Sequence, residues 1–166
     1  MKSPILIIIV IGVAAIASAG GLYYYYQNLA SNLPSLCHDP DSIWSHVYNP
    51  YRLNVIRPCI TASGIVDNVT SEDDGDYHVR LALDSQYSNL TNSANKTYQY
   101  GDLVVEIICA LSPASPQSAI LACEGYTNNI TIPSVNDHIT VTGPYVLDTN
   151  HDNWAEIHPV YSLTTF

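Results

Sequence analysis

The chain has 166 residues, 47% of them hydrophobic, and it carries 5 basic and 15 acidic residues, a formal net charge of −10. This length is typical of one domain of about 100–150 residues with a short additional segment. The basic residues form no run, which excludes a surface of the kind that neutralises phosphates, so we expect no nucleic-acid partner. An acidic domain is instead typical of weak cation binding or a basic partner.

Residues 1–26 are predicted to form an N-terminal transmembrane helix that acts as a signal anchor. Residues 4–22 include no charged side chain, and a helix of about 20 apolar residues spans a bilayer. Lys2 precedes this segment, and the tyrosines at 23–26 follow it. A basic cytoplasmic flank and an interfacial aromatic belt predict a single-pass protein of the cell membrane with an extracellular C-terminal domain.

A cleaved signal peptide is the alternative for the same segment. Residues 17–19 read Ala-Ser-Ala, the A-x-A pattern of a cleavage site, so the protein would instead be secreted after cleavage near Ala19. Residues 27–36 are small and polar and are predicted to form a linker, and residues 37–166 are predicted to form the extracellular domain. Under both interpretations, residues 37–166 are exported from the cell.

Four cysteines lie beyond the apolar segment: Cys37, Cys59, Cys109 and Cys123. An even number of cysteines in an exported chain indicates two disulfides, for which three pairings are possible. We favour the sequential pairing, in which Cys37 bonds Cys59 and Cys109 bonds Cys123, because each pair then encloses a single segment. No pair has the C-x₂-C spacing of a zinc site.

Four N-x-S/T sequons also follow the apolar segment, and all of them lie in predicted turns or loops. Several sequons together are typical of an exported, glycosylated surface. The predicted acceptors are Asn68, Asn89, Asn95 and Asn129.

The domain is expected to begin with a short helix, which Asp41 or Ser42 caps and Pro50 ends. Gly64 lies inside the first strand that follows, where it indicates a bulge or a sharp coil. The intervening segments 84–101 and 109–136 are predicted to be loops. Alternation of apolar and polar residues predicts five strands, at residues 59–69, 77–83, 103–108, 138–147 and 155–163.

A long first strand, a meander of three strands, an insertion and a final hairpin predict a mainly β fold. This order is that of a small five-stranded OB-like Greek-key barrel, here with a short N-terminal helix and one preceding transmembrane helix. The helix often found between the third and fourth strands is expected to be replaced by the loop that Cys109 and Cys123 close. An immunoglobulin-like sandwich suits the chain less, because it needs about seven strands and a Cys–Trp–Cys arrangement.

Several stretches together resemble an uncharacterised family of exported bacterial and archaeal proteins: HVYNPYRLNVIRPCITASG, DGDYHVRLALD, LVVEIIC, VTGPYVLD and WAEIHPVYS. The distinguishing motifs are DGDYH and W-x-EIHPV, and the resemblance covers residues 44–163. It implies an OB-like barrel and no known reaction. The chain departs from the family pattern D-T-x-H-G-W at residues 148–154, which read DTNHDNW. This departure puts the shape of the last turn, and any ligand there, in question.

The common catalytic and binding motifs find no support in the chain. It has no G-x-S-x-G elbow and no phosphate-binding loop, and oxidised cysteines are not nucleophiles. Residues 73–76 are predicted to form a hairpin turn. Asp148, Asn150 and Asp152 have the spacing of a calcium loop, but position twelve is Pro159, which has no carboxylate.

An acid–x–histidine step occurs on two predicted strands, as Asp76 with His78 and as Glu156 with His158. Side chains two apart on a strand share a face. The third strand of an OB barrel lies between the second and the fifth, so Glu106 is expected beside both steps. We therefore expect one polar patch on the outer face, built from distant segments.

This outer face has two interpretations. It is either a ladder of cross-strand ion pairs, for instance Arg80 with Glu106, or a site for a divalent metal ion. The predicted metal ligands are His78, Glu106, Glu156 and His158.

The sequence thus predicts a membrane-anchored extracellular β-barrel that acts as a binding or structural module for an unknown cell-surface partner or ligand. Two alternatives stay open: a metal-dependent hydrolase that uses the outer polar face, and an envelope or pilus-like structural subunit. An envelope or pilus-like subunit would agree with the apolar N-terminus, but the chain lacks a clear pilin-type processing site. A divalent metal ion is the one cofactor indicated, and no catalytic residue is identified.

Overall fold

A computed structural model of the chain describes residues 38–166. The predicted membrane helix at residues 1–26, the cleavage site near Ala19, the linker and Cys37 lie outside the described residues. Within residues 38–166, no helix is long and apolar enough to cross a membrane.

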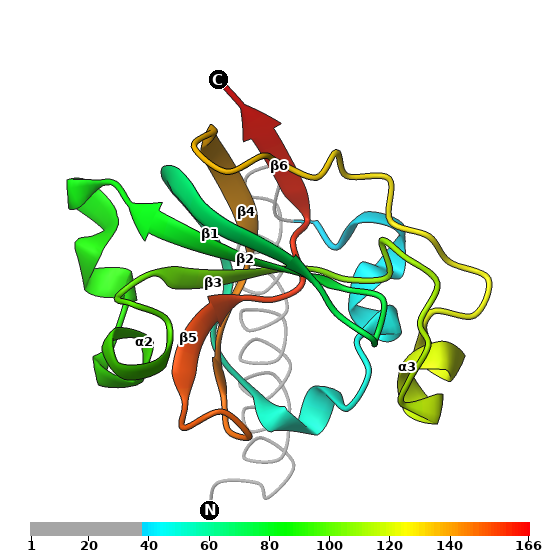
Figure 1. Cartoon of the computed structure of the whole chain (residues 1–166). Helices are drawn as coiled ribbons and strands as arrows, with labels where there is room; N and C mark the ends of the chain where they lie inside the picture. Colours follow the sequence, from blue (N-terminus) through cyan, green and yellow to red (C-terminus); the bar gives the residue numbers. More distant parts are fainter. Residues whose placement is uncertain (1–37) are drawn as a thin grey trace, which may run out of the picture. The chain divides into compact units, whose positions relative to one another are not determined.

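The described domain is mainly β, as predicted, but its sheet has six strands rather than five. The strand order is β1-β2-β3-β5-β4-β6, with an additional pairing between β1 and β4. β3 and β5 run parallel, and the other pairs are antiparallel. The strands are β1 (Leu53–Ser71), β2 (Tyr77–Leu83), β3 (Leu103–Ile107), β4 (His138–Asp148), β5 (Trp154–Ile157) and β6 (Ser162–Thr165) (Figure 1).

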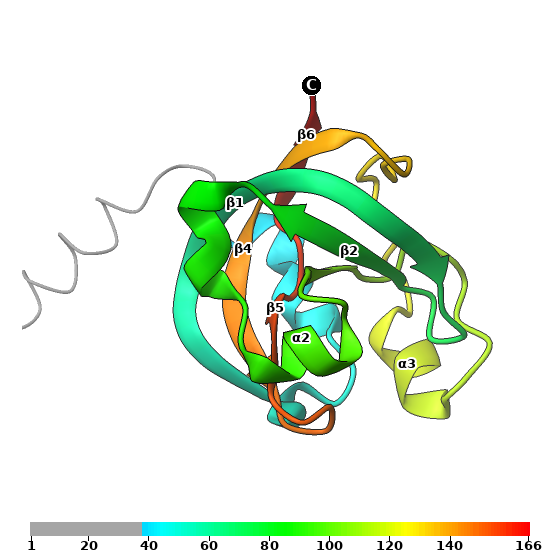
Figure 2. The ribbon, with the colours of Figure 1, turned by 60° about the vertical axis from the view of Figure 1, so that its left-hand side comes forward.

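β1 is long because it pairs with two different strands. Its first part pairs with β4 and its last part pairs with β2, and the two ladders overlap at Gly64 and Ile65. A Cβ atom at Gly64 would lie 2.3 Å from the carbonyl oxygen of Ala82, so glycine is required at this approach. Figure 2 shows β1 curving across the domain from β4 to β2. Gly64, where a bulge or a sharp coil was predicted, therefore lies where the strand changes partner, and the register shifts of β1 lie on either side of it.

The expected last strand, residues 155–163, is divided into β5 and β6. Pro159 lies between them, and proline cannot donate to a ladder because it has no N–H. β5 pairs with β3 and with the end of β4, whereas β6 pairs with the beginning of β4. The connection passes close to Gly143, where a Cβ atom would lie 2.4 Å from the carbonyl oxygen of Pro159.

Short helices precede β1 and lie between the strands, and they differ from the expectation in two respects. The N-terminal helix is a 3₁₀ helix that begins after Asp39, and Asp41 and Ser42 have left-handed φ angles of 52° and 56° inside it. The two expected loops both contain helices, so the insertion closed by the disulfide is not helix-free. The helices are η2 (Pro40–His46), η3 (Pro50–Arg52), η4 (Ser85–Leu90), α2 (Ser93–Tyr98) and α3 (Gln117–Ala122).

The core lies on one face of the sheet, where alternate residues of β2 and β3 are fully buried: Val79, Leu81, Leu103, Val105 and Ile107. A second cluster lies under η2 and includes Ile43, Val146 and the disulfide between Cys109 and Cys123, whose Cα atoms are 5.5 Å apart. This disulfide was predicted. The bond from Cys37 to Cys59 stays a prediction, because Cys37 lies outside the described residues.

Candidate functional site

The acid–histidine residues lie on the opposite face of the sheet from the core, as the alternation predicted. His78 is directly opposite Glu106 in the β2–β3 ladder, and Glu156 is opposite Val104 in the parallel β3–β5 ladder. The expectation of an outer, solvated face is wrong, however. Glu156 and His158 are each 1% exposed, and Glu106 is buried as well. Buried ionisable groups need partners, so their contacts decide their chemistry.

His78 forms a close ion pair across the two strands. Its Nδ1 donates to Oε1 of Glu106 at 2.7 Å, and its Nε2 donates to Oε1 of Gln99 at 3.1 Å. Burial alone would lower the pKa of His78, but the hydrogen bond and the charge of Glu106 outweigh it and raise that pKa to about 9. The imidazole is therefore charged at neutral pH.

The second pair lies within one strand end. His158 Nδ1 donates to Oε2 of Glu156 at 3.0 Å, and the indole N–H of Trp154 donates to the other oxygen of Glu156. Burial opposes ionisation of Glu156, but the hydrogen bond and charge of His158 and the bond from Trp154 hold its pKa below the usual value. Both oxygens of this carboxylate thus have donors.

Glu106 lies between the two pairs and has one oxygen without a partner. Its Oε1 accepts from His78, whereas its Oε2 is buried and has no hydrogen-bond partner among the described residues. An unpaired buried carboxylate oxygen is costly, and such an atom in a native structure calls for an explanation such as a bound ion.

Glu106 also belongs to two sets of groups that could hold a metal ion. One set combines it with Glu156 and His158, and the other with Glu72 and His78; within each set the ligand atoms lie within 4.8 Å of one another. The four predicted ligands therefore form two overlapping sets joined at Glu106, rather than one site.

A cavity of about 200 Å³ adjoins these groups. Arg52, His78 and His151 are the basic residues on its wall, and Tyr48 and Trp154 contribute rings. Carboxylates outnumber the basic groups, so the cavity attracts cations. The carboxylates on its wall are Glu72, Asp74, Asp76, Glu106, Asp148 and Glu156.

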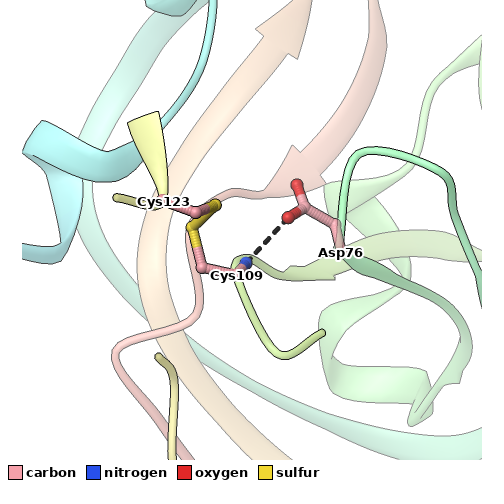
Figure 3. A group of neighbouring side chains, drawn as sticks. All are labelled: Asp76, Cys109 and Cys123. Atoms are coloured by element: carbon pink, nitrogen blue, oxygen red, sulfur yellow. Dashed lines mark hydrogen bonds between the residues drawn. A yellow bond between two sulfur atoms is a disulfide. The ribbon is translucent and has the colours of Figure 1, made fainter. Parts of the chain in front are cut away.

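Asp76 is a buried carboxyl on this wall rather than an exposed edge of the patch. It accepts the backbone N–H of Cys109 at 2.8 Å (Figure 3). Burial, followed by the charges of Asp74 and Glu106, raises the pKa of Asp76 to about 9. Asp76 is therefore protonated at neutral pH, in the same cavity where His78 is charged.

The last turn does not form the calcium loop that its spacing suggests. Asp148 is fully buried; one of its oxygens accepts from Arg52 and His151, and the other accepts the backbone N–H of Asn150. His151 in turn stacks on Trp154, with ring centroids 4.5 Å apart and planes 7° apart. This turn closes one side of the cavity through protein contacts alone.

Two further expectations are corrected. Arg80 does not pair with Glu106, because it bonds Asp67 at 2.7 Å and lies over the ring of Tyr100. Asn95 is unsuited to carry a glycan in the folded domain: it is 0% exposed, and its Nδ2 donates to the carbonyl oxygens of residues 102 and 155. The side chains of Asn68, Asn89 and Asn129 are partly or fully exposed, so they stay predicted acceptors.

Sequence reasoning missed Glu72, Gln99 and Trp154 as parts of the site. A signal existed for Glu72, because the Asp-Gly turn predicts a hairpin that brings residues 72 and 76 together, and Glu72 N–H does donate to the carbonyl of Asp76. Trp154 is two residues before Glu156 and so shares its face. Gln99 comes from the segment predicted to be a loop, and no local pattern marks it.

Comparison of this chain with protein-family models, with curated proteins and with solved structures found no match. The chemistry of the domain must therefore be inferred from its own geometry.

Proposed function

We propose that the domain binds a divalent transition metal ion between Glu106, Glu156 and His158, with His78 and Glu72 beside it. Two observations at Glu106 carry this proposal: its buried Oε2 has no partner among the described residues, and one of its carboxylate oxygens lies within 4.8 Å of ligand atoms of Glu156 and His158. A bound cation would satisfy that oxygen.

The donor set favours a particular class of ion. Two carboxylates and one imidazole are ligands typical of zinc and its neighbours, whereas calcium prefers oxygen ligands alone. The excess of carboxylates around the cavity of about 200 Å³ would concentrate cations at its mouth. Trp154 and Gln99 would act on the ion indirectly, since they hold Glu156 and His78 in place.

The test is a calorimetric titration of the full chain with zinc, manganese and calcium. We expect zinc to bind with a micromolar or lower dissociation constant, and Glu106→Gln to weaken it by at least about tenfold. Glu124→Gln is the matched control, because Glu124 is an exposed glutamate away from the cavity. Equal zinc affinity of wild type and Glu106→Gln, or no binding below the millimolar range, would overturn the proposal.

The finer architecture is part of the same proposal. We infer an OB-like barrel: the order β1-β2-β3-β5-β4, the parallel β3–β5 pair and the ladder from β4 to β1 all support it.

We also infer that the domain acts outside the cell, anchored by residues 1–26 or secreted. The disulfide between Cys109 and Cys123 supports an oxidising compartment. Protease added to intact cells should digest the domain, and full protection would contradict this location.

Binding is the function that these observations favour, and metal-dependent hydrolysis is the second candidate. The cavity has more volume than an ion needs, and Asp76 on its wall is a carboxyl able to exchange a proton with a small molecule. Turnover of chromogenic esters or phosphodiesters that depends on added zinc and is lost in Glu106→Gln would support hydrolysis. Zinc binding without such turnover would leave the domain a metal-binding module.

A further inference from the structure

We propose that the cluster of Asp76, Cys109 and Cys123 becomes a second, thiolate metal site when its disulfide is reduced. A carboxylate oxygen of Asp76 and the two sulfurs lie within 4.8 Å of one another. Figure 3 shows the carboxyl group of Asp76 beside the disulfide, with the two cysteines arriving from different segments. This inference goes beyond the proposed function, because it uses none of the ligands assigned to the first site.

Asp76 and Cys109 are held together by bonds that do not involve sulfur. The N–H of Cys109 donates to Oδ1 of Asp76 at 2.8 Å, and the N–H of Leu111 donates to the carbonyl of Gly75 at 2.9 Å. Gly75 has a φ of 90°, and a Cβ atom there would lie 2.6 Å from the carbonyl oxygen of Leu111. The turn before β2 and the segment after β3 therefore stay in contact when the S–S bond opens.

Cys123 is held independently as well. Its N–H donates to the carbonyl of Ala119 at 3.0 Å, and its own carbonyl accepts from Tyr126 at 3.0 Å. The chain then returns to the other cysteine, since the N–H of Asn128 donates to the carbonyl of Cys109 at 3.0 Å. Reduction therefore leaves two thiols near Asp76 on a hydrogen-bonded frame.

The redox step requires a dithiol as reductant. The dithiol supplies two electrons and is itself oxidised to a disulfide, the bond between Cys109 and Cys123 breaks, and each sulfur takes one proton. A divalent ion then displaces both thiol protons and the proton of the Asp76 carboxyl group, and it binds two thiolates and the Asp76 carboxylate, with water as fourth ligand. Two sulfurs favour zinc, cobalt or cadmium over magnesium and calcium.

The reductant has a route to the disulfide. Cys123 is 8% exposed, and it follows α3, a helix of six residues whose one fully buried side chain is Ala119. A short helix with so little buried surface opens locally at low cost. Opening of α3 exposes the Cys123 sulfur without disturbing the sheet.

The test uses cobalt as the probe, because thiolate ligands give cobalt(II) an intense near-ultraviolet charge-transfer band that oxygen and nitrogen ligands do not give. The full chain is compared before and after treatment with dithiothreitol and its removal without oxygen. The band should appear only after reduction, and zinc should bleach it. Glu106→Gln should keep the band, since that variant affects the first site alone.

Two variants separate this cluster from other thiols of the chain. Cys123→Ser should abolish the band although it keeps Cys37 and Cys59, and Asp76→Asn should weaken cobalt binding by at least about tenfold, since an amide is a poorer ligand than a carboxylate. Circular dichroism monitors the fold of each sample. A reduced wild type that is folded but has no band, a wild type that unfolds on reduction, or an unchanged band in Cys123→Ser would each overturn the proposal.

Discussion

The two acid–histidine steps have the same spacing in the sequence, but the structure uses them in opposite ways. In β5 and the residue that follows it, acid and histidine pair with each other, Glu156 with His158 at 3.0 Å. At the start of β2, the acid and the histidine bond different partners: Asp76, just before the strand, accepts the backbone N–H of Cys109, and His78 pairs with Glu106 of the next strand at 2.7 Å. The same acid–x–histidine spacing therefore yields an acid bonded to its own histidine in one place and, in the other, an acid with a raised pKa bonded to the backbone.

The difference follows from the neighbours of each step. The step at β5 is completely enclosed, so the buried carboxylate of Glu156 depends on the hydrogen bonds that it accepts from His158 and Trp154. The step at β2 begins in a turn, which leaves Asp76 free to meet the insertion after β3. A pattern of residue types sets which face the side chains share, and the packing around it decides which groups pair.

The largest expected effect is that of breaking the enclosed pair. His158→Ala leaves the buried carboxylate of Glu156 without the hydrogen bond from His158, so we expect it to destabilise the domain by about 3–5 kcal/mol in urea unfolding. His138→Ala is the control, because His138 is partly exposed and pairs with the partly exposed Asp84. A loss below about 1 kcal/mol for His158→Ala would show that the pair at β5 is no more constrained than a surface pair.

The second-largest loss of stability is expected for substitution of Asn95, whose side chain holds β5 beside the cavity. Asn95 is the third residue of α2 and completes the capping box that Asn92 begins, and it exchanges hydrogen bonds in both directions with the backbone of Ala155. Asn95→Ala removes these bonds and leaves buried backbone groups unpaired, so we expect a loss of about 2–4 kcal/mol.

Asn89→Ala is the matched control for this change, since Asn89 is exposed, and it should stay within about 0.5 kcal/mol of wild type. Mass spectrometry of protein from a glycosylating host adds a second measurement, because a glycan found on Asn95 would contradict its burial.

A smaller effect is expected for the pair between β2 and β3. His78→Gln keeps a hydrogen-bond donor near Glu106 but removes the charge, so we expect a loss of about 1–2 kcal/mol, less than that of His158→Ala. Urea unfolding of both variants at one pH measures the difference. A loss equal to or larger than that of His158→Ala would reverse the ranking of the two steps.

The smallest expected effect is a change in how the stability of the domain depends on pH. Asp76 and His78 both have pKa values raised to about 9 in the folded domain. A raised pKa means that the folded state holds a proton which the unfolded state has released. The stabilisation is therefore fully present below the unfolded pKa and is lost as the pH rises toward 9.

Asp76→Asn has nearly the same shape and cannot titrate, so its stability should fall less than that of wild type between pH 6 and pH 9. Urea midpoints across this range measure the two slopes. Asp67→Asn is the control, because Asp67 is an exposed partner of Arg80. Parallel curves for wild type and Asp76→Asn would mean that Asp76 is ionised in the folded domain.

Much of the strand arrangement could be predicted from local pattern. The alternation in β2 and β3 correctly divided the apolar core face from the polar face. Gly64 marked a close approach to Ala82, but the irregularities of β1 lie on either side of it, between Val55 and Ile60 and between Val66 and Asn68. The pairing of Cys109 with Cys123 was also correct. These features depend on residue period, backbone freedom and close spacing, which are all properties of short stretches of chain.

Burial of the polar face could not be predicted in this way, because distant segments produce it. The cavity on the polar face is also lined by Gln99 after α2, Arg52 in η3 and Trp154 of β5. Nothing in the sequences of β2 or β3 indicates that these segments bury their polar face. The burial that these segments produce leaves one oxygen of Glu106 without a partner among the described residues and raises the pKa of Asp76. Alternation along each strand fixes which side chains share a face. Their charge is set only on folding, since ionisation depends on the surrounding dielectric and on neighbours that the folded chain brings together.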